Sequence, residues 1–216
     1  MVVLAALLTD AAAAYAVPAA PKGDVYALGT CPVSGEKLGS MGEPVVKQYD
    51  GREVRFCCQA CVGKFEAKQE EYLAKVDARI VSQQKDVYPL ETCVVSGEKL
   101  GGMGEPVDYV YKNRLVRFCC KGCVKSFEKD PAASLAKLDE AAIAKQAPNY
   151  PRRTCVVSGE TLGSMGESID YVTGNRLVRF CCRACVKQFE KDPAAYLDKL
   201  SGETDEAADG EPTNAH

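Results

Sequence analysis

The sequence contains a single histidine, His216, and it is the last residue. Chemistry that needs an internal imidazole is therefore excluded, including Cys-His and Ser-His-Asp catalysis and a catalytic zinc held by histidines. No other pattern pairs a nucleophile with a base, so we do not expect an enzyme. An excess of charge of one sign is also missing, since 27 Lys and Arg stand against 30 Asp and Glu. This balance favours neither nucleic acid nor an anionic membrane as a partner.

Long hydrophobic runs are missing as well. The apolar run over residues 2–8 is too short to span a bilayer. Small residues at positions 11–14, followed by Ala14-Tyr15-Ala16, are typical of a signal-peptide cleavage site. We therefore predict a signal peptide over residues 1–16 and a periplasmic or secreted protein with no membrane anchor after cleavage. No basic residue precedes the apolar run and Asp10 interrupts it, so an Ala-rich leader without a targeting role is the alternative.

Cysteine, in contrast, is abundant and strictly periodic. Cys31, Cys93 and Cys155 are 62 residues apart, and a cluster of three cysteines recurs downstream of each with the same offset. All 12 cysteines are used in this way, four in each copy. Such a period predicts a tandem repeat. We assign three units to residues 25–84, 87–146 and 149–200, and we expect the acidic tail at 201–216 to be disordered.

Each unit has the same order of local patterns. An extended lead-in ends in Thr-Cys, and a Val-Ser-Gly-Glu turn and a Leu-Gly-x-Met-Gly-Glu loop follow. Two β-branched runs then flank a turn dipeptide such as Asp50-Gly51, which predicts a hairpin. A helical pattern follows the cysteine cluster, and Asp130-Pro131 and Asp192-Pro193 predict the start of a second helix. The first unit has no such pair, so its two helical stretches are expected to run on as one.

The predicted fold is therefore α+β: three small tandem units, each a knuckle, a β-hairpin and one or two C-terminal helices. Short polar linkers at residues 82–86 and 144–148 suggest units that unfold independently. Domains of about 45 residues seldom gain enough from a hydrophobic core alone. Such a core supplies about 3–5 kcal/mol, whereas a structural zinc site can contribute on the order of 10 kcal/mol. Whatever joins the cysteines is therefore expected to dominate stability.

The spacing of the clustered cysteines favours a metal site. Cys57 and Cys58 lie four and three residues before Cys61, so they share a face with it if a helix begins there. A helix N-terminus also lowers a thiol pKa, which favours the thiolate that metals bind. The turn after Cys31 can direct backbone N–H groups at its sulfur. Arg55, Arg117 and Arg179 either stabilise the thiolates from the strand or are solvated. The predicted ligands are Cys31, Cys57, Cys58, Cys61, Cys93, Cys119, Cys120, Cys123, Cys155, Cys181, Cys182 and Cys185.

A lead cysteine in a knuckle, a hairpin ending in Phe-Cys, and Cys-x3-Cys before a helix resemble the TRASH and YHS families of small metal-binding modules. The resemblance spans residues 31–73, 93–135 and 155–197. It implies a treble-clef-like zinc-ribbon fold, a role in heavy-metal sensing, trafficking or resistance, and Cys31, Cys57, Cys61 and their repeats as ligands. TRASH modules usually open with Cys-x2-Cys, but position 34 here is serine. Cys58 and its repeats are the substitutes for the fourth ligand.

The expected ion is one Zn²⁺ or Cu⁺ for each unit, either carried as cargo or bound as the centre of a zinc-stabilised interaction scaffold. Each unit has one methionine at the same position: Met41, Met103 and Met165. A thioether can bind Cu(I), but we favour the interpretation that these flexible side chains fill the core. One alternative is a disulfide-stapled extracellular interaction module, because exported proteins meet oxidising conditions. The other is a thiol redox protein using Cys58-x-x-Cys61, which would need a thioredoxin-like βαβ setting.

Overall fold

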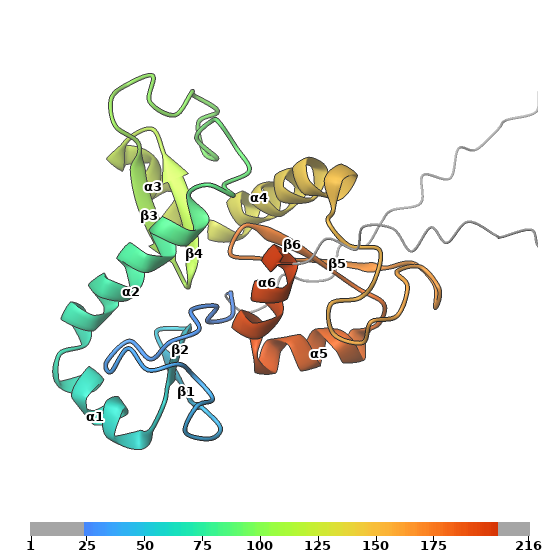
Figure 1. Cartoon of the computed structure of the whole chain (residues 1–216). Helices are drawn as coiled ribbons and strands as arrows, with labels where there is room; N and C mark the ends of the chain where they lie inside the picture. The colour runs from blue at the N-terminus through green and yellow to red at the C-terminus, as the bar shows by residue number, and fades with distance from the viewer. Residues whose placement is uncertain (1–23, 203–216) are drawn as a thin grey trace, which may run out of the picture.

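The computed structural model describes residues 24–202 and confirms an α+β chain of three repeated units. In each unit an antiparallel two-stranded hairpin is followed by two helices (Figure 1). The predicted signal peptide and all but the first two residues of the predicted tail lie outside the described residues. Within the part that is described, no helix is both long and apolar enough to cross a membrane.

The hairpins form where the sequence predicted them. In the first unit the strands pair from Val45 opposite Phe56 to Tyr49 opposite Arg52, and both turn residues have positive φ, 50° at Asp50 and 74° at Gly51. The first unit consists of β1 (Val45–Tyr49), β2 (Arg52–Phe56), α1 (Gln59–Ala67) and α2 (Gln69–Gln84). The second consists of β3 (Val107–Tyr111), β4 (Arg114–Phe118), α3 (Lys121–Lys129), α4 (Pro131–Gln146) and the short η1 (Ala147–Asn149). The third consists of β5 (Ile169–Thr173), β6 (Arg176–Phe180), α5 (Arg183–Lys191) and α6 (Pro193–Gly202).

A single non-helical residue separates the two helices of every unit. The prediction of one continuous helix in the first unit is wrong, because Lys68 has φ −142° and its N–H donates to the Phe65 carbonyl at 3.0 Å. Asp130 and Asp192 occupy the same place before their prolines, and Asp192 caps its helix by accepting the Ala195 N–H at 3.3 Å. The break therefore does not depend on proline; it turns the second helix so that Tyr72 stacks on Phe65.

The helices also extend further than the sequence patterns indicated. Residues 82–84 and 144–146, which were predicted to be linkers, are the last turns of α2 and α4. Ser201 and Gly202, assigned to the tail, belong to α6. Each unit has its own core around a pair of fully buried phenylalanines, one from the hairpin and one from the first helix. These pairs are Phe56–Phe65, Phe118–Phe127 and Phe180–Phe189, with ring centroids 5.1, 5.3 and 5.3 Å apart.

The last helix of one unit holds the hairpin of the next, which does not fit the expectation of independent units. Gln84, at the end of α2, donates to the Asn113 carbonyl at 2.9 Å and accepts the Leu115 N–H at 2.8 Å. Gln146, at the end of α4, makes the same two bonds with Asn175 and Leu177 at 2.8 and 2.9 Å. Figure 1 shows α2 leading from the first unit to the second and α4 from the second to the third.

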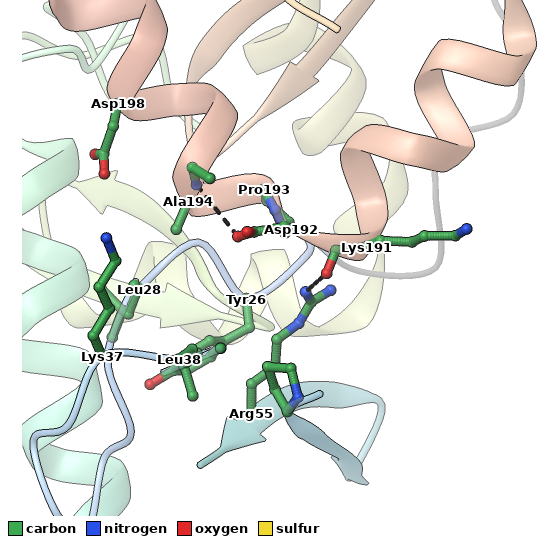
Figure 2. Close-up of a pocket in the computed structure, with 14 residues that line it drawn as sticks. Tyr26, Leu28, Lys37, Leu38, Arg55, Lys191, Asp192, Pro193, Ala194 and Asp198 are labelled. Carbon is green, nitrogen blue, oxygen red and sulfur yellow. Dashed lines mark hydrogen bonds between the residues drawn. The ribbon is translucent and has the colours of Figure 1, made fainter. Parts of the chain in front are cut away.

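The first unit also contacts the third, so the three units close on one another. The buried Arg55 guanidinium donates to the Glu190 carbonyl at 2.6 Å and to the Lys191 carbonyl at the end of α5. Asp24, just before the first unit, accepts the Gly174 N–H at 2.8 Å and donates its own N–H to Lys112 O at 3.2 Å. Figure 2 shows the closing contact, where Arg55 reaches Lys191 beside a cavity of about 110 Å³. We therefore expect the units to unfold together.

Candidate metal centre

The first cysteine of each unit lies in a tight turn before the hairpin. The Cys31 N–H donates to the Glu36 carbonyl at 2.8 Å, and the Gly35 N–H donates back to the Cys31 carbonyl at 2.9 Å. Gly35 has φ 77°, a left-handed conformation that costs glycine little. The same two bonds, at 2.7 and 2.8 Å, form the turns after Cys93 and Cys155. The turn therefore fixes the direction of this sulfur through backbone geometry.

The other three cysteines lie where the hairpin meets the first helix. Cys57 follows the last residue of β2, Cys58 is the N-cap residue of α1, and Cys61 lies in the first turn of that helix. The Cys61 N–H donates to the Cys58 carbonyl at 3.2 Å, and this hydrogen bond stabilises the turn between the two cysteines. The predicted helical start at the cluster is confirmed.

Three cysteines in each unit converge on one point and could hold a metal ion. In each group the Sγ atoms all lie within 4.8 Å of one another, and the side chains are mostly buried, with exposed fractions of 0%, 6% and 6% for Cys31, Cys57 and Cys61. Cys123 is the one partly exposed member. The three groups are Cys31, Cys57 and Cys61; Cys93, Cys119 and Cys123; and Cys155, Cys181 and Cys185.

The fourth cysteine of each unit lies beside this triad. Cys58 Sγ is 3.7 Å from Cys61 Sγ and 3.9 Å from Cys57 Sγ, and the Cys57–Cys61 separation is 3.7 Å. Sulfurs 2.3 Å from a tetrahedral zinc would be about 3.8 Å apart, so these distances suit shared metal ligands. They are far longer than a disulfide bond of about 2.05 Å, and all twelve cysteines are free thiols. Cys120 and Cys182 lie 3.8 and 3.7 Å from their Cys123 and Cys185 partners.

A serine that the sequence reasoning treated only as a missing cysteine proves to contact the site. Ser34 Oγ lies 3.3 Å from Cys57 Sγ, and the same 3.3 Å separates Ser96 from Cys119 and Ser158 from Cys181. Because Ser34 Oγ already accepts the Glu36 N–H at 3.3 Å, its own proton is available to a sulfur. Its repetition in all three Val-Ser-Gly-Glu turns was the signal that could have revealed this role.

The thiols of a triad differ widely in acidity. Burial alone would raise the pKa of Cys31, but hydrogen bonds from the Ser34 hydroxyl and from backbone N–H groups of the turn and of Cys57 lower it to about 7. The pKa of Cys93 is lowered to about 6, and that of Cys155 to about 7, by the equivalent groups. Burial, with hydrogen bonds to Cys57 and Cys58, raises the pKa of Cys61 to about 12. The turn cysteine is therefore the first to offer a thiolate.

The strand arginines pair with carboxylates and do not stand free in solvent. Arg117 Nε donates to Asp108 at 2.7 Å and Arg179 Nε to Asp170 at 2.8 Å, because the hairpin register places each aspartate opposite its arginine. Arg55 bonds Glu53 at 2.7 Å and the carbonyls of the third unit described above. These bonds give the arginines a structural role, and stabilisation of thiolate charge by them stays a prediction.

The repeated methionines are exposed, which contradicts the prediction that they fill the core. Their exposed fractions are 60%, 67% and 64% for Met41, Met103 and Met165. The loop keeps its shape without a buried anchor, because Gly39 and Gly42 have φ 87° and 105° and the Ser40 N–H donates to the Lys37 carbonyl at 3.3 Å. Their thioethers are therefore available to solvent.

The setting that thioredoxin-like chemistry would need is not found among residues 24–202. The sheets there are three antiparallel hairpins of two strands each, with no βαβ unit. No family model matches the sequence, and no curated protein and no solved structure matches the chain. The geometry of the cysteines therefore carries the functional argument, and the resemblance to the TRASH and YHS modules stays a prediction.

Proposed function

We propose that this chain is an exported metal-binding protein that carries a soft or borderline ion in each of its three units. The observation that carries the proposal is the convergence of three cysteine sulfurs within 4.8 Å in every unit, with a fourth beside them. Thiolates select soft and borderline ions over Mg²⁺ and Ca²⁺. The ion is cargo in this proposal, since the fourth thiol of each site is partly exposed.

Zn²⁺ is the ion that we propose first. Zinc sites are commonly built from thiolates, and the 3.7 Å between Cys57 Sγ and Cys61 Sγ suits two ligands of a tetrahedral zinc. Cu⁺ is the second candidate, because it takes fewer thiolates and accepts thioethers, and each unit exposes one methionine. The resemblance to TRASH and YHS modules supports a role in heavy-metal trafficking or resistance, and the pattern in residues 1–16 supports export. We propose binding rather than catalysis, because the single histidine is His216.

Metal content is the direct test. Protein purified without chelator should contain three ions per chain, one for each cysteine group. Cys61→Ala should lower this number to two, because it removes a buried ligand from one unit and leaves the other two intact. Ser40→Ala is the matched control, since this hydroxyl is exposed and bonds only the Lys37 carbonyl. A count of free thiols near zero with no metal bound would instead favour the disulfide-stapled interaction module.

Two further measurements separate the remaining alternatives. Titration of Cu(I) against a competing ligand of known affinity compares copper with zinc, and the Met41→Leu variant reports whether the thioether contributes. Extraction of the ion by a chelator, followed by circular dichroism, separates cargo from scaffold. Retained helical signal supports a carrier, whereas a loss of folding on extraction supports a zinc-stabilised interaction scaffold.

A further inference from the structure

The four thiols of each unit differ in how far solvent can reach them. Cys31, Cys57 and Cys61 are buried, but Cys58 is only partly covered. Cys120 and Cys182 share this partial exposure at the same position of the other units. Each is the N-cap residue of its helix, has an extended backbone with φ between −158° and −161°, and makes no side-chain capping bond. In the first and third units the sulfur of this residue is therefore the one that an incoming ligand reaches most readily, and in the second unit it shares partial exposure with Cys123.

The partly exposed thiol shares its neighbours with the buried triad. Cys58 Sγ lies 3.7 Å from Cys61 Sγ and 3.9 Å from Cys57 Sγ. Cys57 and Cys61 therefore belong to two overlapping sets of three sulfurs, one completed by Cys31 and the other by Cys58. An ion that passes between the two sets keeps two ligands and exchanges only the third. Because the distances already suit metal ligands, this exchange requires no rearrangement of the hairpin or of the helix.

We propose that Cys58, Cys120 and Cys182 are exchange ligands through which the ion enters and leaves the buried triads. This inference rests on the proposed metal-carrying function. An ion arrives bound to a thiolate of a donor, and its bond to Cys58 sulfur forms as its bond to the donor sulfur breaks. The Cys58 proton passes to the released donor thiolate, and no atom changes oxidation state. Cys57 and Cys61 then take the ion toward Cys31, each losing its thiol proton to solvent.

If these cysteines are exchange ligands, replacing them should change the rate of zinc transfer much more than the affinity for zinc. In Cys58→Ala/Cys120→Ala/Cys182→Ala, we expect zinc transfer to and from a small thiol ligand to slow about 100-fold, while zinc affinity falls by no more than about tenfold. Ser40→Ala/Ser164→Ala is the control and should change neither quantity, because both hydroxyls are exposed and bond only a local carbonyl. Stopped-flow transfer to dithiothreitol and equilibrium competition with a chromophoric chelator measure the two quantities.

The outcomes distinguish this inference from the proposed function. Unchanged zinc-transfer rates in the triple variant would overturn the exchange role. So would a loss of zinc affinity in the triple variant as large as the loss caused by Cys61→Ala and its equivalents in all three units, because Cys58 would then be an ordinary fourth ligand. Absence of both zinc and copper binding by the unmodified chain overturns the proposed function itself.

A second measurement on the unmodified chain covers the case in which the variant does not fold. In the zinc-loaded protein, iodoacetamide should modify Cys58 and Cys182 before the buried cysteines of their units, and Cys120 before Cys93 and Cys119, as followed by mass spectrometry of the peptides. Equal protection of all four cysteines in each unit would overturn the inference.

Discussion

The hydroxyl of Ser34 should control both the acidity of Cys31 and the affinity of the first site. Ser34→Ala removes the donor that lies 3.3 Å from Cys57 Sγ and that helps to lower the pKa of Cys31 to about 7. A hydrogen bond to a charged group contributes about 1.5–3 kcal/mol. One pKa unit corresponds to about 1.4 kcal/mol, so the Cys31 pKa should rise toward its ordinary value of 9.

The same loss should weaken metal binding. Removal of a group that supports a ligand typically lowers metal affinity about 10–100-fold, and we expect this for the first unit of the Ser34→Ala protein. The thiolate absorbance of the metal-free protein, followed against pH, reports the pKa, and competition with a chelator reports the affinity. Ser40→Ala is the matched control, because its exposed hydroxyl lies in the loop that follows this turn and donates to the Lys37 carbonyl. If Ser34→Ala changes neither quantity, the assignment of its proton to the sulfurs is wrong.

Three further predictions concern stability, pH and the exposed loop. Asn175→Ala should lower the free energy of unfolding by about 2–5 kcal/mol in urea titrations, because it leaves the buried partners Arg114 Nε and Leu115 O, each at 2.9 Å, without their bonds. Asn175→Gly is its control for the positive φ of 63°, and a loss below about 0.5 kcal/mol would contradict the packing argument. Metal affinity should increase as pH rises from about 6 to 9, because the ion must displace the proton of thiols such as Cys61, whose pKa is raised to about 12. An affinity that does not change with pH in chelator competition would count against thiolate ligands. Met41→Leu should leave the thermal midpoint unchanged within error, since the side chain is 60% exposed, whereas a clear drop would restore a packing role.

Because the three units contact one another, removal of the metal from one unit is expected to affect the stability of all three. Gln84 and Gln146 connect neighbouring units, and Arg55 connects the first with the third. The sequence alone shows two polar helix ends and a strand arginine. Nothing in their local pattern indicates a partner in another unit, 29 residues away for the two glutamines and 135 residues away for Arg55. Because they bond backbone groups of another unit, the order in which the units pack could be decided only by the tertiary structure.

The repeat itself was determined by the sequence. A period of 62 residues in all 12 cysteines, alternating β-branched runs and left-handed turn residues such as Asp50-Gly51 are local signals. They predicted the hairpins and the helical start at the clusters, because each depends on short-range geometry. The grouping of Cys31 with Cys57 and Cys61 was implied by the resemblance to TRASH and YHS modules. The helix break at Lys68 was missed because no proline or capping residue marks it.

Other features of the site depended on which side chains approach one another in space. Neither the exposure of Met41 nor the contact of Ser34 with a sulfur 23 residues away could be predicted from the sequence, since both follow from how the turn lies on the hairpin. The difference between buried Cys57 and partly exposed Cys58 is of the same kind. Cys57 and Cys58 are neighbouring cysteines just before the same helix, and only the fold directs one sulfur into the core and leaves the other within reach of solvent.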